Sequence, residues 1–239
     1  MRTIIQSFKY AEPLCNAFRS LGFNTHIWDE RYKPAFDLFA EFQPELVICK
    51  SDCSNDLVKC IAKYKTRAYC FVSSGLNQYV VPHVHSFFTD NPGVRLNFDA
   101  RLKYLPPAFD HTVYKPSQAL GGTFYVGNYD DSLHWLLWAI SDTRIRILGQ
   151  GWPLRSLGQF LPATELRALS GPVVCYTMQQ TLKTLACGGA PIVKFSEETA
   201  HLPTFSSYEE MLEQIKKPRK IHFDIEPHTY VERVKELLA

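Results

Sequence analysis

Short apolar runs alternate regularly with amphipathic helical segments along this chain, and this alternation constrains its fold more than any other feature. In the first part of the chain, helical patterns at 11–21, 34–42 and 55–64 separate apolar runs at 2–6, 24–28, 46–49 and 67–72. Repeated βα units of this length are typical of a parallel sheet with helices on both faces. The sequence therefore predicts an α/β fold.

A second set of βα units follows a short polar segment. Residues 117–122 are mostly small or polar and lack periodicity, which indicates a hinge. Before the hinge the apolar runs shorten, to 84–88 and 102–105. After it, the pattern predicts strands at 123–126, 145–148, 172–176 and 190–193 and helices at 131–140, 164–169 and 179–186. We therefore predict one lobe at 1–116, a hinge at 117–122 and a second lobe at 123–222.

Two further helices are predicted near the end of the chain. Ser207 and Glu210 form a capping box that opens a helix through Lys216. The last helix, at 227–238 within a terminal segment 223–239, is amphipathic. One face carries Tyr230, Val231, Val234, Leu237 and Leu238, and the other carries Glu232, Arg233, Lys235 and Glu236. Its apolar face must pack against another part of the molecule.

The composition excludes several classes of protein. With 46% hydrophobic residues, the chain can bury enough apolar surface to fold, so a disordered or fibrous protein is excluded. The net charge is +2 (26 minus 24), and the interspersed charges favour neither nucleic acid nor an anionic membrane as partner. No apolar run approaches the ~20 residues that span a bilayer, and no secretory signal opens the chain. We expect a cytoplasmic protein.

The seven cysteines are odd in number and repeat no spacing. Cys49, Cys53, Cys60 and Cys70 lie close together in sequence but lack the paired spacing of a zinc site. We expect reduced, buried thiols and no metal.

Two glycine-containing segments could contact a ligand. Gly149, Gln150, Gly151 and Trp152 follow a predicted strand, where glycines let backbone amides approach a ligand and Trp152 offers a flat apolar face. Leu154 stands where a dinucleotide-binding GxGxxG motif needs its third glycine, so a plain tight turn is an equal alternative.

The second segment is the helix that ends at Gly188 and Gly189. Unpaired amides at its start, around 178–181, would attract a diphosphate, and Lys183 could add a charged contact. The alternative is a helix C-cap with close packing of helix against strand.

Six segments, taken in order, resemble the CgeB-like family of glycosyltransferases, which is related to spore maturation proteins and has the GT-B fold. They are FFTDN (87–91), YLPPAFD with YKP (104–116), FYVGN (124–128), ILGQGWP (147–153), LKTLACGGAPIV (182–193) and HTYVERVKELL (228–238). The first 80 residues match the family only in their βα rhythm.

The resemblance implies two Rossmann-like lobes with parallel sheets (GT-B type) and a C-terminal helix that crosses back to the first lobe. It implies a nucleoside-diphosphate sugar as co-substrate, held mainly by the second lobe, and an acceptor held mainly by the first. No metal or other cofactor is then required, because amides and the helix dipole stabilise the leaving diphosphate. The donor-binding residues would be Gly127, Gly149, Gln150, Gly151, Trp152, Gln180, Thr181, Lys183, Gly188 and Gly189, with His228 and Arg233 as secondary site residues.

The chain departs from the family at two positions. An acidic residue usually stands at the position of Lys183, and an arginine at that of Gln180. A carboxylate could accept hydrogen bonds from both ribose hydroxyls, whereas lysine only donates. Either the donor is held differently, with Lys183 on a phosphate and Glu197 or Glu198 near the ribose, or donor binding has been lost.

An inverting transferase needs a base near the acceptor hydroxyl. Asp90 and Asp52 follow predicted strands of the first lobe and are the candidates, with Asp29 as a third. Each could instead cap a helix or a turn. His83 and His85 would share one strand face, as hydrogen-bonded histidines or as ligands of a metal or phosphate.

The predicted function is therefore transfer of a sugar from a nucleoside-diphosphate donor to a hydroxyl acceptor. The acceptor could be a glycan, a protein or a base in DNA, the last supported only by a basic set that is also typical of a solvated helix face. That set is Lys59, Lys63, Lys65 and Arg67. The alternative is a non-catalytic relative that binds a nucleotide or a protein partner. Sequence leaves the sugar, the stereochemical course and the oligomeric state open.

Overall fold

The computed structural model describes residues 1–73, 77–91, 93–94, 102–134, 136, 144–153, 168–217 and 221–239. These residues form two compact units, each built on a parallel sheet. The first unit comprises Met1–Pro107 and Tyr230–Ala239, and the second comprises Ala108–Thr229. The segment 117–122 lies within the second unit.

The first unit contains a six-stranded sheet in the order β2-β1-β3-β4-β5-β6. Its strands are β1 (Arg2–Gln6), β2 (Asn24–Trp28), β3 (Leu46–Lys50), β4 (Arg67–Phe71), β5 (Ser86–Thr89) and β6 (Leu102–Tyr104). All described pairings are parallel, and Thr3 of β1 pairs with Thr25 on one side and Leu46 on the other. The predicted parallel α/β sheet is confirmed.

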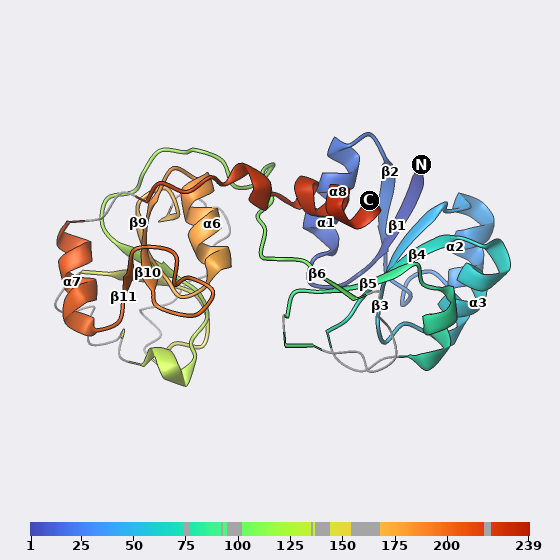
Figure 1. Ribbon diagram of the computed structural model, residues 1–239, viewed down its shortest axis with the longest axis horizontal. Coiled ribbons are helices and arrows are strands. Elements are labelled where there is room, and N and C mark those ends of the chain that lie inside the picture. The colour runs from blue at the N-terminus through green and yellow to red at the C-terminus, as the bar shows by residue number, and fades with distance from the viewer. Residues whose placement is uncertain are drawn as a thin grey trace. The chain divides into compact units, whose positions relative to one another are not determined.

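Helices cover both faces of this sheet (Figure 1). Helices α2 (Ala35–Phe42) and α3 (Asn55–Tyr64) contact each other on one face, where Ile4, Val47 and Leu57 join one buried cluster. Helix α1 (Ala11–Ser20) lies on the other face together with α8 (Tyr230–Leu238). The predicted return of the C-terminal helix to the first lobe is therefore confirmed.

Two predictions for the first unit need correction. Helix α8 begins at Tyr230, after a 3-10 turn η3 (Glu226–His228), and it buries Arg233, which the sequence pattern placed on the exposed face. The segment before β5 is a 3-10 helix η1 (Gln78–His83), whose start is capped by the Asn77 side chain. His83 and His85 therefore lie before the strand, exposed, rather than on one strand face.

The second unit contains a five-stranded parallel sheet in the order β11-β10-β9-β7-β8. Its strands are β7 (Phe124–Val126), β8 (Arg146–Leu148), β9 (Pro172–Cys175), β10 (Ala190–Lys194) and the unpredicted, two-residue β11 (Thr204–Phe205). Helix α6 (Met178–Ala186) packs on one face and α7 (Tyr208–Lys216) on the other (Figure 1). The predicted capping box of α7 is confirmed.

Two predicted helices of the second unit lie partly outside the described residues. Of the helix predicted at 131–140, the structure describes a 3-10 turn, η2 (Asp131–Leu133). Of the helix predicted at 164–169, residues 164–167 lie outside the described part.

All seven cysteines are buried, and none of them forms a disulfide bond. Within the described residues, no group of His, Cys, Asp or Glu side chains is arranged to hold a metal ion. No described helix is long and apolar enough to cross a membrane.

Candidate functional site

The carboxyl edge of the second sheet is where its topology favours a ligand. The chain runs from β7 to β8 on one side and then returns to β9 on the other. In open parallel sheets, ligands bind where the strand order reverses in this way, beyond the carboxyl ends of the strands. Gly127 follows β7 at this point, and Tyr176 and Thr177 follow β9.

The side chain of Gln180 spans this reversal point. Its Nε2 donates to the Val126 carbonyl at 3.2 Å, and its Oε1 accepts from the amides of Tyr176 at 2.7 Å and Thr177 at 3.3 Å. The Thr177 hydroxyl in turn accepts from the Gln180 amide at 3.2 Å, which completes a capping box. Gln180 therefore joins the end of β7 to the start of α6.

Several amides predicted to hold a diphosphate are bonded within the chain. The Met178 amide donates to Glu198 Oε2 at 3.3 Å, and the Thr181 amide donates to the Thr177 carbonyl at 3.1 Å. Helix N-termini attract anions, and here the carboxylate of Glu198 already occupies part of that position. A diphosphate at the start of α6 would have to displace Glu198.

The loops after β7 and β8 are held together by backbone contacts. The Gly127 amide donates to the Leu148 carbonyl at 2.8 Å, and the Tyr129 amide donates to the Gln150 carbonyl at 2.8 Å. A Cβ on Gly149 would stand 1.8 Å from the Gly127 carbonyl oxygen, so only glycine allows this approach. The structure thus gives Gly149 a packing role, while Gln150 and Gly151 remain exposed beside it.

Trp152 is not the exposed flat face that the sequence suggested. It is 6% exposed, and its Nε1 donates to the Gly127 carbonyl at 3.0 Å. Its ring lies edge-on against Tyr125 at 5.8 Å and Tyr129 at 5.2 Å between ring centroids. The indole is part of the core because the loops after β7 and β8 fold over it.

Gly188 and Gly189 lie at the opposite edge of the sheet from Gly127 and Gly149. They precede β10, whereas Gly127 and Gly149 follow their strands, and all these strands are parallel. The nine residues of α6 alone extend about 13 Å between the two edges. A Cβ on Gly189 would stand 2.0 Å from the Leu169 carbonyl oxygen, so this glycine allows the predicted close packing before the strand.

Two other predicted donor-binding residues make contacts within the second unit. Lys183 lies in the middle of α6, with its Nζ 4.7 Å from the centre of the Tyr114 ring. Thr181 is fully buried, and its hydroxyl donates to the Thr177 carbonyl at 3.1 Å. No described contact joins either side chain to the exposed loop at Gln150.

The structure distinguishes among the three candidate carboxylates of the first sheet. Asp90 follows β5, and its Oδ2 accepts a hydrogen bond from the Tyr10 hydroxyl and lies 3.4 Å from Lys9 Nζ. Asp52 follows β3, but it is 61% exposed and its contact with Lys50 is longer, at 3.7 Å. Tyr10 and Lys9 were not predicted, because nothing in sequence connects the end of β1 with β5.

Asp29 is a poor candidate for a base. Arg31 Nε donates to both of its carboxylate oxygens, at 3.0 and 3.1 Å. These hydrogen bonds lower the pKa of Asp29 to about 2. A group that holds its proton so weakly accepts one poorly from an acceptor hydroxyl.

Carbon-detected NMR titration should therefore find the Asp29 carboxyl ionised down to about pH 2. In Arg31→Ala the pKa of the same carboxyl should rise toward its ordinary value of about 3.9. It should stay below that value, because the backbone amide of residue 31 still donates to Oδ1 at 3.0 Å. A midpoint as low in Arg31→Ala as in the wild type would show that the Arg31 side chain does not stabilise the charge.

The secondary site residues His228 and Arg233 belong to different units. The His228 ring lies 4.9 Å from the Phe223 ring, and its carbonyl accepts from the Phe109 amide at 3.0 Å. Arg233 is 5% exposed, and its Nε donates to the Pro106 carbonyl at 3.2 Å. Arg233 thus fastens α8 to the first unit.

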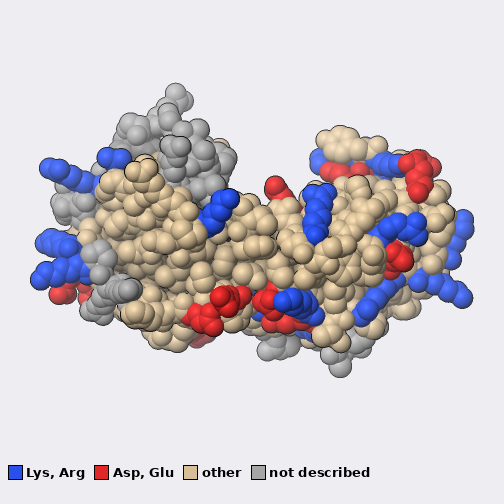
Figure 2. All heavy atoms as spheres, turned by 90° about the horizontal axis from the view of Figure 1, so that it is seen from above, with Lys and Arg blue, Asp and Glu red and all other residues tan. Residues whose placement is uncertain are grey.

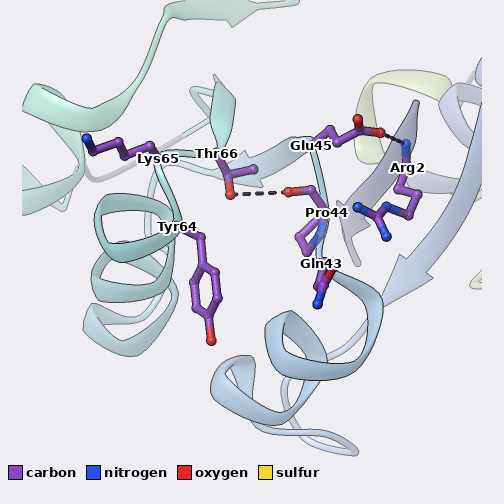
Figure 3. Close-up of a pocket in the computed structure, with 7 residues that line it drawn as sticks. All are labelled: Arg2, Gln43, Pro44, Glu45, Tyr64, Lys65 and Thr66. Atoms are coloured by element: carbon purple, nitrogen blue, oxygen red, sulfur yellow. Dashed lines mark hydrogen bonds between the residues drawn. The ribbon is translucent and has the colours of Figure 1, made fainter.

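A pocket of about 440 Å³ lies at the amino edge of the first sheet (Figure 3). Arg2, Glu45, Tyr64 and Lys65 are among its lining residues, and the Arg2 amide donates to Glu45 at 2.7 Å. No sequence motif marks these residues. They lie at the ends of α2 and α3 and the starts of β1, β3 and β4, the edge opposite the one where parallel sheets bind ligands.

Among the four basic residues considered for DNA binding, Lys59 and Lys63 contact neighbouring side chains on the first unit. Lys59 Nζ lies 3.2 Å from Asp56, and Lys63 Nζ lies 5.3 Å from the centre of the Tyr64 ring. On the face shown in Figure 2, basic and acidic side chains are interspersed. Such contacts are typical of a solvated helix face.

No protein-family model matches the chain, and no curated protein is similar to it. Among solved structures, the apo form of D-lactate dehydrogenase from Escherichia coli is similar, with 10% identity and a TM-score of 0.28 over 91% of this chain and 79% of that one. A Salmonella D-lactate dehydrogenase gives 12% identity and a TM-score of 0.26 over 91% and 76%. Similarity this weak indicates neither a family nor a function. What stands is a Rossmann-like α/β architecture of two parallel-sheet lobes.

Proposed function

We propose that the chain transfers a sugar from a nucleoside-diphosphate donor to a hydroxyl acceptor. The observation that carries the proposal is the convergence of three separate segments at one edge of the second sheet. Gly127 from FYVGN, Gln150 from ILGQGWP and the start of the helix that contains LKTLACGG adjoin there. These are segments on which the resemblance to CgeB-like glycosyltransferases rests, and their meeting point is where such sheets hold ligands.

In this proposal the donor lies against the exposed Gln150 and Gly151, with its diphosphate toward the start of α6. Glu198 would leave the Met178 amide as the diphosphate arrives. Gly188 and Gly189 play no part in donor binding, because they lie at the other edge of the sheet.

A binding screen with nucleoside diphosphates and their sugars tests this proposal. A ligand that binds only the folded protein raises its melting temperature. We expect one nucleotide sugar to stabilise the protein and to release its diphosphate when an acceptor is supplied. A well-folded sample that none of them stabilises would contradict the proposal.

Glu198→Gln should bind the nucleoside diphosphate more tightly than the wild type. The change removes a negative charge that competes for the start of α6, an effect of about 0.3–1 kcal/mol, or roughly two- to five-fold in affinity. Calorimetric titration measures it. The matched control is Glu213→Gln, at an exposed residue of α7 that has no described contact with α6. Equal affinities of the two variants would show that the diphosphate does not bind at the start of α6.

A second candidate function is that of a non-catalytic relative that binds a nucleotide or a protein partner. The contacts that favour it are those of Lys183 with Tyr114 and of Glu198 with the Met178 amide, since both groups are engaged within the second unit. This candidate predicts binding of a nucleotide without turnover of any sugar donor.

A further inference from the structure

The two groups that contact Asp90 come from the connection between β1 and α1. The Tyr10 hydroxyl donates to Oδ2 of Asp90, and Lys9 Nζ lies 3.4 Å from the same oxygen. Throughout the part of the chain that the structure describes, no hydrogen bond or ion pair reaches the other oxygen, Oδ1. Among the described residues, one oxygen of this carboxylate is held by Tyr10 and Lys9, and the other accepts no hydrogen bond.

Tyr10 is better suited than Lys9 to orient this carboxylate. Its ring lies edge-on against Phe71 at 5.3 Å and tilted against Tyr230 at 6.1 Å between centroids. Burial, and then the hydrogen bond with Asp90, raises the pKa of Tyr10, so the hydroxyl keeps its proton and donates at neutral pH. The Lys9 side chain is 66% exposed, so its position is less constrained.

We propose that Tyr10 is a positioning residue that holds the Asp90 carboxylate so that Oδ1 takes the proton of the acceptor hydroxyl. This inference rests on the proposed transferase function. As the acceptor oxygen bonds to the anomeric carbon, the bond from that carbon to the diphosphate oxygen breaks. The electron pair leaves with the diphosphate, and the acceptor proton passes to Asp90. Tyr10 keeps its own proton throughout and touches no substrate.

Tyr10→Phe tests the inference, because it removes the hydroxyl and keeps the ring that packs on Phe71. We expect kcat for release of the nucleoside diphosphate, with water or an alcohol as acceptor, to fall about ten- to hundred-fold, as is typical when a catalytic group loses its orientation. Donor affinity should stay within about two-fold, since Tyr10 belongs to the other unit from the proposed donor site. Tyr79→Phe, at a 71% exposed tyrosine of the same unit, is the matched control and should change neither value.

A second comparison separates positioning from a merely structural role. Asp90→Asn should lower kcat strongly, and adding Tyr10→Phe to it should cause no further loss, because the two residues act as one unit. A full rate in Tyr10→Phe, an equal additional loss in the Asp90→Asn background, or a full rate in Asp90→Asn would each overturn the inference. If the wild type binds a donor but turns over none, the proposed function itself fails, and this inference fails with it.

Discussion

Gly149→Ala is expected to destabilise the second unit by at least about 3 kcal/mol, at the upper end of what an added methyl group costs in a packed interior. The new Cβ would stand 1.8 Å from the carbonyl oxygen of Gly127, and the nearest atoms are all backbone atoms, which cannot rotate away as a side chain can. Relief requires the loops after β7 and β8 to separate. That separation breaks the hydrogen bond between the Gly127 amide and the Leu148 carbonyl, at 2.8 Å, and exposes Trp152.

Two other glycines serve as controls for this substitution. At Gly121 nothing lies within 4 Å of an added Cβ, so alanine there should leave stability within about 0.5 kcal/mol. At Gly151 the nearest atom is 3.7 Å away, but φ is +78°, so alanine should cost about 1–2 kcal/mol. Urea denaturation followed by circular dichroism measures all three variants. If Gly149→Ala were as stable as Gly121→Ala, the close approach of the two loops would be wrong.

The different stability costs at Gly149 and Gly151 also determine which of the two glycines can be used to probe the proposed donor site. A bulky residue at Gly149 would abolish binding by disrupting the unit, so its loss of activity would carry no information about a ligand. Gly151 is exposed, and its added side chain would meet little protein. A large residue at Gly151 is therefore the useful variant, because it can block a donor while the unit stays folded.

Much of the fold could be predicted because the spacing of apolar residues and the residue types at turns and helix caps are local features of the sequence. The apolar runs at 2–6 and 24–28 are strands, and the Ser207 capping box opens α7, as predicted. Parallel topology was also sufficient to separate the two glycine motifs. A helix between parallel strands returns to the amino edge, so Gly188 and Gly189 had to lie away from Gly149. The family resemblance places both glycine motifs in one donor site, whereas the path of the chain separates them.

The contacts that give the candidate sites their chemistry could not be predicted in the same way. Glu198 reaches Met178 across 20 positions, and Tyr10 reaches Asp90 across 80. Such pairs leave no periodic signal in a single sequence. The burial of Trp152 likewise depends on tertiary packing. The sequence of a glycine loop beside an aromatic residue is the same whether the ring faces a ligand or the core.

Arg233→Ala is expected to destabilise the first unit by about 2–3 kcal/mol, the range for a lost hydrogen bond from a charged group together with buried side-chain packing. Arg233 is 5% exposed, and its Nε donates to the Pro106 carbonyl at 3.2 Å. Its Nη1 also lies 2.8 Å from Glu236, but that carboxylate is 52% exposed, and the ion pair contributes little. The main loss is therefore the hydrogen bond that joins α8 to Pro106, near the end of the Met1–Pro107 segment.

Lys235→Ala is the matched control, because Lys235 lies on the same helix and pairs with Glu232 at 2.6 Å. Its side chain is 54% exposed, so its removal should change stability by less than about 0.5 kcal/mol. Chemical denaturation compares the two variants, and titration with the donor compares their affinities. If Arg233 acts through the fold, Arg233→Ala loses stability and the folded fraction binds the donor as the wild type does. If the role implied by the family resemblance is correct instead, stability stays close to that of Lys235→Ala and donor affinity falls. The buried position of the guanidinium and its bond to Pro106 favour the first result, because a group so enclosed has little surface left with which to touch a substrate.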